Sequence, residues 1–498
     1  MGIYDLLITE EAGFKNPIYL EDDWSWSFKS HVRRSYLYKN SQFSESNADR
    51  NRRPFKNIVR PVLNIHYRTE GFDVKDIELY VNNPDKYFKS FLVNKFHEKW
   101  ALENEMDTFI DELVESYVDY GGVLVKNVDG ARPEVVDLRT IAFCDQTDIL
   151  SGPFAIKHFF TPVQLREMSK KGWGDSSKGA TIDLDTLIAI ANNQKQQSKD
   201  YVKSKTPGKY IEVYEVHGIF PQEWLRGREY DQRNETKYSW QIHIIALYTS
   251  HTNEKYGVTL FSAKEPELPF KFLSRDKVQG RALGFGAIEE LFEAQLWTNF
   301  AEIHMFEMLE HASKVFYKTT DARFKTRNSL RNAEMGQVFD LQAGTDISSL
   351  DNTPRNLIAF NNAVVEWENH ANTIGAASEA LQGEAPKSGT PFKLFEAQVI
   401  EGKSLHQWRQ GRIAVFVDEI YRDWSLPYIS KEITKGQKFL AELSGDELQD
   451  VAERIARKKM SDFVKEEILS GRLPTNEFIQ SKQIEIQETF LRGGSKRF

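Results

Sequence analysis

The spacing of apolar residues separates a mixed first part of the chain from a helical second part. Over residues 84–118 apolar positions recur every three or four residues, which predicts one helix that ends at the Gly-Gly pair 121–122. Three later runs, 210–220, 239–248 and 256–262, alternate apolar and polar residues and predict strands. The apolar positions of the predicted helix are Phe88, Phe91, Leu92, Phe96, Trp100, Phe109, Leu113 and Tyr117.

Turn residues complete the prediction for the first part. Asp129 and Gly130 lie between the apolar runs 123–125 and 135–136, which is a hairpin signal. Residues 192–208 are rich in Gln, Lys and Ser and are typical of a solvated loop or linker. We therefore expect residues up to about 280 to form a mixed α+β domain.

The second part alternates long helices with polar segments. An apolar stripe without proline predicts a helix over 286–316, and a seam spaced three and four residues apart predicts a second helix that packs lengthwise on another. Between them, 317–353 is polar and turn-rich, with Val338 and Phe339 as a candidate strand core. A Gly/Pro-containing loop at 375–391 then precedes a long helix at about 392–424. The seam residues are Leu357, Phe360, Val364, Trp367, Ala371 and Ile374.

The C-terminal region is expected to be helical throughout. Ser444 and Glu447 form a capping box, and the helix that they begin should end at Ser470, with Gly471 as its stop. The remaining residues are also predicted to be helical, and they end in a short basic tail.

Composition adds little about chemistry. The chain has 498 residues, which suggests about three packing units, and its net charge is −8, so bulk charge does not indicate nucleic-acid binding. Its one cysteine, Cys144, excludes an intrachain disulfide and a cysteine-based zinc cluster. The N-terminus lacks the pattern of a signal peptide, and no run of 18 apolar residues occurs, so we expect a soluble protein made in the cytoplasm.

Residues 1–60 differ in charge from the rest of the chain. From Lys29 to Arg60 there are nine Lys and Arg residues against Glu45 and Asp49 alone, which predicts an arm or a mobile flank. Two interpretations stay open. The interleaved aromatic residues could stack on nucleic acid, or the arm could pack on a neighbouring subunit. These aromatic residues are Tyr36, Tyr38, Phe43 and Phe55.

Catalytic and nucleotide-binding motifs are incomplete in this sequence. Gly402-Lys403-Ser404 ends like a phosphate-binding loop, but position 397 is alanine and the motif lies within a predicted helix. His97-Glu98 begins a zinc-protease motif, but position 101 is alanine.

Loop residues also fall short of a site. In the run that begins at Gly284, Glu289 replaces the third glycine of a dinucleotide fingerprint, so we expect a flexible entry into a helix. Asp145 and Asp148 could form half of a two-metal site, but acidic pairs in loops are more often turn formers. We expect no enzymatic activity, no cofactor and no metal site, and the eleven histidines show no ligand spacing.

The order of these parts resembles the subunit of a phage portal protein, the ring at one capsid vertex of tailed double-stranded DNA bacteriophages. Local sequence is also similar to portal sequence at Tyr117–Gly122 before a strand, at Pro269–Gly284 before a helix, and at Gly383–Thr390 before a helix. The resemblance covers most of the chain, although none of these motifs is diagnostic by itself.

This resemblance implies the fold class and the domain boundaries. The fold would be an α+β, portal-like subunit with a mixed α/β wing, two stem helices, a small α/β clip, a tunnel loop, a long helix and a helical C-terminal crown. The implied parts are an N-terminal arm (1–60), the wing (61–285), stem helix 1 (286–316), the clip (317–353), stem helix 2 (354–374), the tunnel loop (375–391), the long helix and C-terminal wing (392–440), and the crown (441–498).

The resemblance also implies the location and the partners. The protein would form a homo-oligomeric ring, a dodecamer in most portals, in the virion at the capsid portal vertex. It would guide DNA during packaging, retention and ejection, and it would dock the terminase large subunit and then a head–tail adaptor. Major capsid and scaffold proteins would be further partners, double-stranded DNA would pass through without sequence-specific binding, and no membrane would be involved.

Three groups of candidate site residues follow from this resemblance together with the charge pattern. An acidic or nearly neutral wall lets DNA slide, whereas a cationic wall holds it by counterion release. The channel-facing stem would carry Glu289, Glu293, Glu302, Glu307 and Glu310. The tunnel loop would present Glu379, Glu384, Pro386, Lys387, Ser388, Gly389 and Thr390. The clip would meet acidic partner surfaces with Lys318, Arg323, Lys325, Arg327 and Arg331.

Two other classes stay open at this point. One is a phage nucleic-acid-processing enzyme, either a nuclease or a helper ATPase, and the incomplete motifs argue against it. The other is a minor capsid or scaffold protein without a channel. A ring with a central hole would select the portal interpretation, whereas a compact monomer with metal-dependent activity would select the nuclease.

Overall fold

A computed structural model gives the arrangement of most of the chain. It describes residues 2–21, 24–43, 54–80, 87–128, 132–197, 210–225, 238–249, 255–265, 267–313, 317–320, 341–349, 356–377, 379–382, 392–434, 445–471 and 475–492.

Helices and strands both contribute, so the chain is α+β. The helices are α1 (Ile3–Gly13), α2 (Phe28–Lys39), α3 (Val59–Glu70), α4 (Tyr87–Glu103), α5 (Met106–Tyr120), α6 (Pro162–Glu167), α7 (Leu184–Gln197), α8 (Ala287–Glu290), α9 (Phe292–Ser313), α10 (Leu357–Ile374), α11 (Glu379–Gln382), α12 (Phe392–Ile420), α13 (Leu426–Thr434), α14 (Gly445–Leu469) and α15 (Asn476–Arg492). The strands are β1 (Ile18–Glu21), β2 (Trp24–Trp26), β3 (Gly122–Lys126), β4 (Glu134–Val136), β5 (Ile141–Ala142), β6 (Phe154–Phe160), β7 (Ile211–Pro221), β8 (Tyr238–Thr249), β9 (Lys255–Lys264), β10 (Phe270–Ser274), β11 (Tyr317–Thr319) and β12 (Ile347–Ser349).

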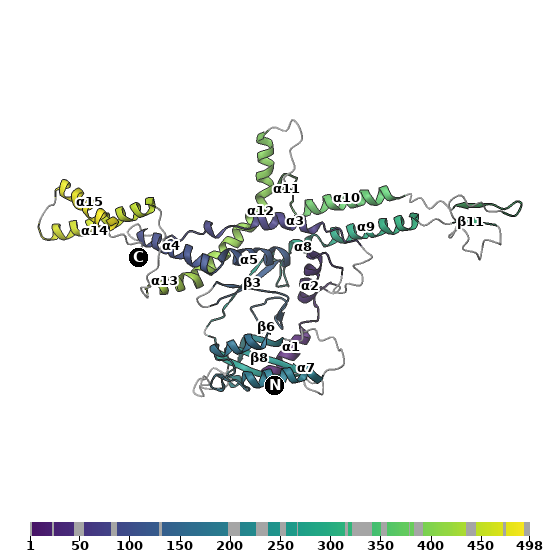
Figure 1. Ribbon diagram of the computed structural model, residues 1–498, viewed down its shortest axis with the longest axis horizontal. Coiled ribbons are helices and arrows are strands. Elements are labelled where there is room, and N and C mark those ends of the chain that lie inside the picture. Colours follow the sequence, from purple (N-terminus) through teal and green to yellow (C-terminus); the bar gives the residue numbers. More distant parts are fainter. Residues whose placement is uncertain are drawn as a thin grey trace.

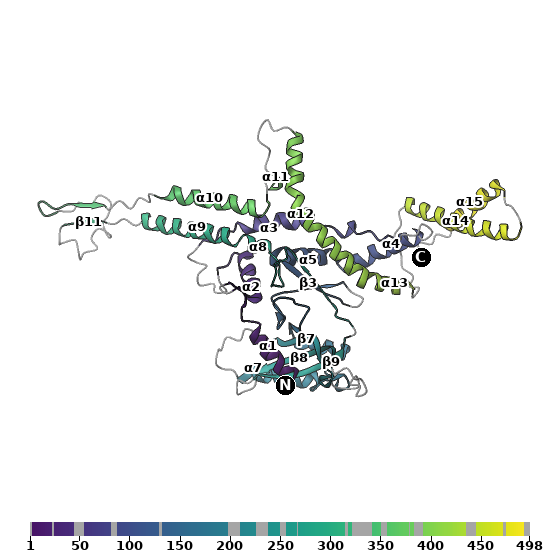
Figure 2. The same ribbon diagram turned by 180° about the vertical axis from the view of Figure 1, so that it is seen from behind.

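The molecule is elongated, with projections from a central body. In Figure 1, α9 and α10 extend to the right, α14 and α15 lie at the left end, and one end of α12 stands above the body. The reverse view in Figure 2 shows the same arrangement, with the strand-rich part below the body. Side chains on the projections therefore have few neighbours within the chain.

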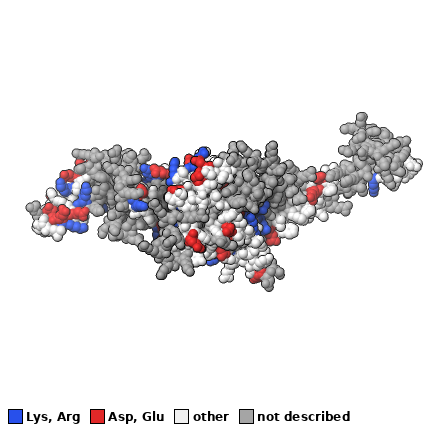
Figure 3. Space-filling model, turned by 90° about the horizontal axis from the view of Figure 1, so that it is seen from below, with Lys and Arg blue, Asp and Glu red and all other residues white. Residues whose placement is uncertain are grey.

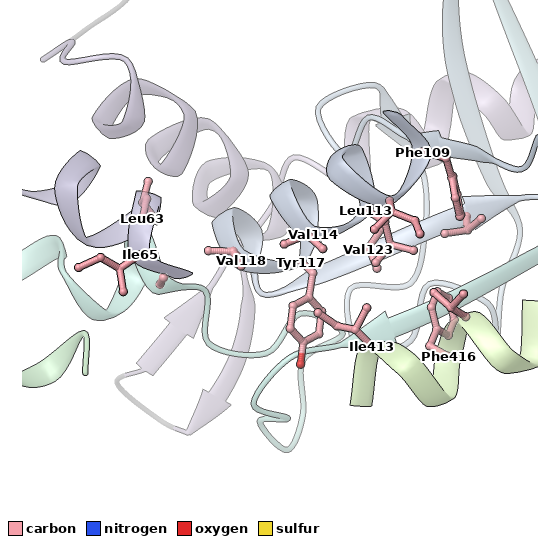
Figure 4. Close-up of a cluster of buried hydrophobic side chains, with 14 of the residues drawn as sticks. Leu63, Ile65, Phe109, Leu113, Val114, Tyr117, Val118, Val123, Ile413 and Phe416 are labelled. Carbon is pink, nitrogen blue, oxygen red and sulfur yellow. The ribbon is translucent and has the colours of Figure 1, made fainter. Parts of the chain in front are cut away.

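The core of the body forms where α3, α5, α8 and α12 meet. Helix α5 contributes two adjacent rows of apolar residues, one of which is Phe109, Leu113 and Tyr117 at i, i+4 spacing, and all three are buried. Figure 4 shows these side chains in one cluster with Val123 of β3 and with Ile413 and Phe416 of α12. The core thus fixes α12 to the elements that carry the sheet.

The predicted helix over 84–118 is two helices. Glu105, between α4 and α5, has a φ of 52°, in the left-handed region, so the chain turns there instead of continuing. The apolar spacing on both sides is helical, which is why periodicity alone did not reveal the break. The predicted stop at Gly121 is confirmed, with a φ of 79° at this residue.

Two antiparallel sheets form the strand-rich part. The three predicted strands 210–220, 239–248 and 256–262 are confirmed as β7, β8 and β9, neighbours in the five-stranded order β5-β6-β7-β8-β9. The predicted hairpin is confirmed as the pair β3–β4, which joins β10 in a second sheet, while its turn residues Asp129 and Gly130 lie outside the described residues. One face of the larger sheet packs on α6 and α7, and the opposite face packs on Leu7 of α1.

The expected arm or mobile flank is instead folded onto the same chain over most of its described length. Leu7, Phe28 and Val32 are buried, and the Phe28 N–H donates to Gln146 Oε1 at 3.0 Å. Helix α2 keeps its basic residues largely on the outside and buries the apolar residues between them. The net positive charge of this region masked that pattern, so the prediction of an arm was wrong for 3–21 and 24–43.

The helical second part follows the prediction with local differences. The helix predicted over 286–316 is divided at Leu291 into α8 and α9, and the helix predicted at about 392–424 continues through a π-helical turn at Tyr421–Ser425 into α13. Gly471 follows α14 with a φ of 82°, as expected for a helix stop. Ser444 and the candidate strand Val338–Phe339 lie outside the described residues.

Candidate assembly surface

Helices α9 and α10 form an antiparallel pair with their own seam. The indole rings of Trp297 and Trp367 are stacked, with centroids 6.4 Å apart, and His304 stacks on Phe360. Val364 and Ala371 are buried against α9 and the body. The predicted lengthwise packing of the second helix is thus confirmed, and α9 is the helix on which it packs.

The body end of this hairpin is held by an extended segment, residues 54–58. Gln295 of α9 accepts from the Ile58 N–H at 2.9 Å and donates to the Lys56 carbonyl at 2.7 Å. Asn299 accepts from the Lys56 N–H, and the Lys56 ammonium reaches Glu302 of α9 and Glu368 of α10. These contacts fix both helices to the body, so the hairpin is a defined projection.

The outer faces of α9 and α10 carry large apolar side chains that are exposed in the single chain. Leu296 is 54% exposed, Phe306 is 51% exposed and Ile358 is 76% exposed. Others at similar exposure on the two helices are Trp297, Phe300, Leu309 and Val365. Scattered apolar residues are normal on a surface, but a concentration of large apolar side chains on a projecting helix pair indicates an interaction surface. We call this set of seven side chains the hairpin apolar face.

The acidic residues expected on the first stem helix have different surroundings. Glu289 of α8 is held by the Arg281 guanidinium through two hydrogen bonds of 2.8 Å, and Glu302 pairs with Lys56. Glu307 lies 3.3 Å from His304, while Glu293 and Glu310 are exposed. The charges of Glu289 and Glu302 are therefore balanced within the chain, and a channel-facing role for the five remains a prediction.

The clip and tunnel-loop candidates are only partly described. Lys318 is exposed on β11, which pairs with β12, whereas Arg323, Lys325, Arg327 and Arg331 lie outside the described residues. Glu379 is the first residue of α11. The other loop candidates, Glu384, Pro386, Lys387, Ser388, Gly389 and Thr390, also lie outside them, so both assignments remain predictions.

A second apolar surface runs along α12. Ile400, Trp408 and Val415 are each more than half exposed, and Trp408 and Val415 line a hollow of about 520 Å³ between α12 and β10. Strand β10 supplies Phe272 and Leu273 to its wall. The hollow opens next to an edge strand, since β3 is the only strand that pairs with β10 among the described residues.

Charges of one sign do not gather on the face drawn in Figure 3. Figure 3 shows acidic and basic side chains close together at the end formed by α14 and α15, and no large patch of one sign among the coloured residues of this face. Within the described part of the chain, no helix has the length and apolar character needed to cross a membrane.

A buried charged cluster lies inside the body, where α3, α12 and the end of β10 meet. It consists of Glu70, His66, Arg275, His406 and Arg409, and we call it the Glu70 cluster. Glu70 Oε1 lies 2.7 Å from His66 Nδ1, 3.1 Å from His406 Nδ1 and 3.1 Å from Arg275 Nη2. All four of these side chains are fully buried.

The electrostatics of this cluster favour an ionised carboxylate. Burial alone would raise the pKa of Glu70, but hydrogen bonds from His406 and His66 and the charge of Arg275 hold it far below its usual range. Burial lowers the pKa of His66 to about 4, although the hydrogen bond to Glu70 alone would raise this pKa. At neutral pH His66 is therefore uncharged, and Glu70 is the anion between two arginines.

His66, Glu70 and His406 are also close enough together to bind one metal ion, since their ligand atoms lie within 4.8 Å of one another. However, Arg275 Nη2 is only 3.2 Å from His66 Nδ1, and Arg409 Nη1 is 3.7 Å from Glu70 Oε1. Both guanidinium groups stay charged, so a cation at this point would meet strong repulsion in a buried setting. The donor set fits a buried ion-pair network better than a metal site.

Sequence reasoning missed this cluster because its members are far apart in the chain. His66 and Glu70 are four residues apart on α3, which is a weak signal, and 336 positions separate Glu70 from His406. The residues that the sequence offered as metal-ligand candidates make structural contacts instead. His97 is buried against the Tyr421 hydroxyl at 2.9 Å, and Asp145 accepts from the Thr147 N–H as a turn former.

The comparisons with known proteins add structural neighbours only. No family model and no curated protein matches the chain. One solved structure, described as "Neck of empty GTA particle computed with C6 symmetry" (GTA, gene transfer agent), contains a chain 10% identical to this one, with a TM-score of 0.36, covering 94% of this chain and 99% of its own.

Two further structures are similar at the same level of identity, 10%. A chain of "Virion of native gene transfer agent (GTA) particle" has a TM-score of 0.32 and covers 83% of this chain and 94% of its own. A chain of "Neck of native GTA particle computed with C12 symmetry" has a TM-score of 0.32 and covers 85% and 82%. These neighbours are virion and neck components, and TM-scores this low carry no argument about function.

Proposed function

We propose that this chain is a subunit of a ring-shaped DNA channel at one vertex of a virus-like particle, the role of the portal proteins that its sequence resembles. The observation that carries the proposal is the projecting α9–α10 hairpin, which is fixed at its base yet exposes the hairpin apolar face along its length. Covering such a surface with a partner is favourable, because it removes apolar area from water.

A ring of identical copies would cover this surface in every subunit by repeating one contact. In a closed cyclic oligomer each subunit presents one surface to the next copy and receives another on its opposite side. A projecting helix pair can meet two neighbours in this way, with apolar residues on more than one side. Apolar side chains are exposed on both α9 and α10, which supports contacts with two neighbouring copies.

The channel role would place acidic residues of the first stem helix toward DNA. Glu293, Glu307 and Glu310 are exposed on α9, and an acidic wall would avoid the counterion release that holds DNA on cationic surfaces. Lys318 and the other basic clip residues would meet the terminase large subunit and later a head–tail adaptor. Contacts with major capsid and scaffold proteins belong to the same proposal.

Substitutions on the hairpin apolar face test this proposal. We expect the double variant Leu296→Glu, Phe306→Glu to remain folded and to lose the ring, because it places charges where a neighbour would bury apolar atoms. The measurement is sedimentation velocity together with circular dichroism. The matched control is Val163→Glu on α6, which is 66% exposed and lies away from the hairpin, and it should assemble normally.

The result shows whether the α9–α10 hairpin is the assembly surface. A folded double variant that assembles as well as the wild-type chain would refute the assignment of the hairpin as the assembly surface. Loss of assembly in the Val163→Glu control as well would show that the effect is not specific to the hairpin.

A further inference from the structure

Helix α10 ends next to the Glu70 cluster, and the chain then enters the segment that leads to α12. Gly375 N–H donates to the Ala371 carbonyl, and Ala377 N–H donates back to Asn372, so the turn at 375–377 is hydrogen-bonded onto the end of α10. Gly375 lies against α3, where an added Cβ would be 2.4 Å from Val62 Cγ1. The turn is therefore pressed directly on the helix that carries Glu70.

Two side chains hold this turn and α11, one from the cluster and one from α3. His406 places Nδ1 3.1 Å from Glu70 Oε1 and Nε2 3.3 Å from the Ala376 carbonyl, so its ring bridges the buried carboxylate and the turn. Arg68 of α3 donates to the Leu381 carbonyl of α11 at 2.9 Å. Residues from α3 and α12 thus hold both ends of the stretch 375–382.

The cluster also fixes α12 to the end of β10. Arg409 donates to Asp276 at 2.5 Å, and Arg412 donates to the Arg275 and Ser274 carbonyls at 2.9 and 3.0 Å. Glu290 of α8 accepts from Arg409 at 3.4 Å and lies 3.8 Å from Arg275. One buried network therefore connects α3, α8, β10, α12 and the turn after α10.

We infer that the Glu70 cluster, through His406, acts together with Arg68 of α3 to position the described part of the segment between α10 and α12, residues 375–377 and 379–382. His406 and Arg68 are the positioning residues. In the proposed function this segment is the tunnel loop, and the inference that it faces DNA rests on that function. The positioning itself does not, because it depends only on contacts within one chain. A displacement of α12 relative to α3 would change the His406 bridge and move the turn at 375–377 with it.

Hydrogen exchange on the full-length protein tests the inference. In Arg68→Ala the exchange of amides in 375–382 should accelerate about two- to tenfold, the equivalent of one hydrogen bond, while α5 keeps its wild-type protection. Arg68 is exposed on α3, so this variant is expected to fold. Arg68→Lys retains a donor and should restore part of the protection.

His406→Gln tests the buried bridge. A glutamine can donate to Ala376 or to Glu70 but cannot span both, so we expect about tenfold or faster exchange at 375–377 with a smaller effect in the strand-rich part. His158→Gln, remote from the cluster, is the control. Wild-type exchange at 375–382 in both Arg68→Ala and His406→Gln would overturn the inference, as would uniform acceleration along the whole chain.

Electron microscopy of the same samples keeps the two proposals apart. Altered exchange at 375–382 in a protein that forms no ring would support the positioning role and refute the channel. A normal ring with unaltered exchange in both variants would support the channel and refute the positioning role.

Discussion

At the scale of single residues, most of the contacts that the sequence did not reveal are between buried polar side chains. Arg275 is the largest fully buried side chain, and its guanidinium is partnered by Glu70 and His66 across more than 200 positions. No local pattern encodes such a contact, because periodicity reports only which face of an element is apolar. The burial of Phe109, Leu113 and Tyr117, by contrast, follows from their spacing.

His217 gives a residue-level prediction about pH. Its two ring nitrogens face carboxylates, Glu215 at 3.1 Å and Glu265 at 2.9 Å, and Lys126 and His158 also contact Glu215. Burial alone would lower the pKa of His217, but the hydrogen bonds to Glu215 and Glu265 raise it above 6.5. Because the folded-state pKa is raised, the stabilisation is complete below the unfolded pKa and is lost as pH rises through the folded pKa.

The expected result is a pH-dependent cost of His217→Gln. The variant should lower the free energy of unfolding by about 1–3 kcal/mol near pH 5.5, and the difference from wild type should shrink as pH rises toward about 9. Urea unfolding at both pH values provides the measurement. A cost that is the same at both would contradict a charged His217 between two carboxylates.

At the scale of elements, the sequence predicted types better than junctions. Strands β7, β8 and β9 and helices α10, α12 and α14 lie where the patterns predicted them. The break at Glu105 was missed because a left-handed residue leaves no mark on apolar spacing. The break at Leu291, where the backbone stays right-handed, was missed because the apolar spacing continues through it. The folded N-terminal region was missed because charge hid the apolar side of α2.

The junction between α5 and β3 supports a matched pair of substitutions. Gly121 has a φ of 79°, and a Cβ there would lie 2.3 Å from the Gly284 carbonyl oxygen. Gly344 has a φ of 84° with nothing within 4 Å of such an atom. Both Ala variants carry the strain of positive φ, about 1 kcal/mol, whereas only Gly121→Ala also forces two backbone segments apart.

We therefore expect Gly121→Ala to lower the free energy of unfolding by about 3 kcal/mol or more and Gly344→Ala by about 1 kcal/mol. Chemical unfolding followed by tryptophan fluorescence compares them. Equal effects of the two substitutions would contradict the close contact between Gly121 and the segment before α8.

At the scale of the whole molecule, the order of parts was the most informative feature of the sequence. A mixed α+β part, a helix pair, and then long helices follow one another as expected, whereas the short helix α11 lies in the segment that was predicted to be a loop. Composition could not predict the elongated shape in Figures 1 and 2. The shape depends on which apolar side chains find no partner within the chain. In the proposed function a neighbouring copy covers the hairpin apolar face.

The direct test of the central claim is electron microscopy of the purified full-length chain over a range of concentrations. We expect closed rings with a central hole, in which the α9–α10 hairpins of neighbouring copies cover one another's apolar faces. A population of monomers at every concentration, with salt or DNA making no difference, would contradict it.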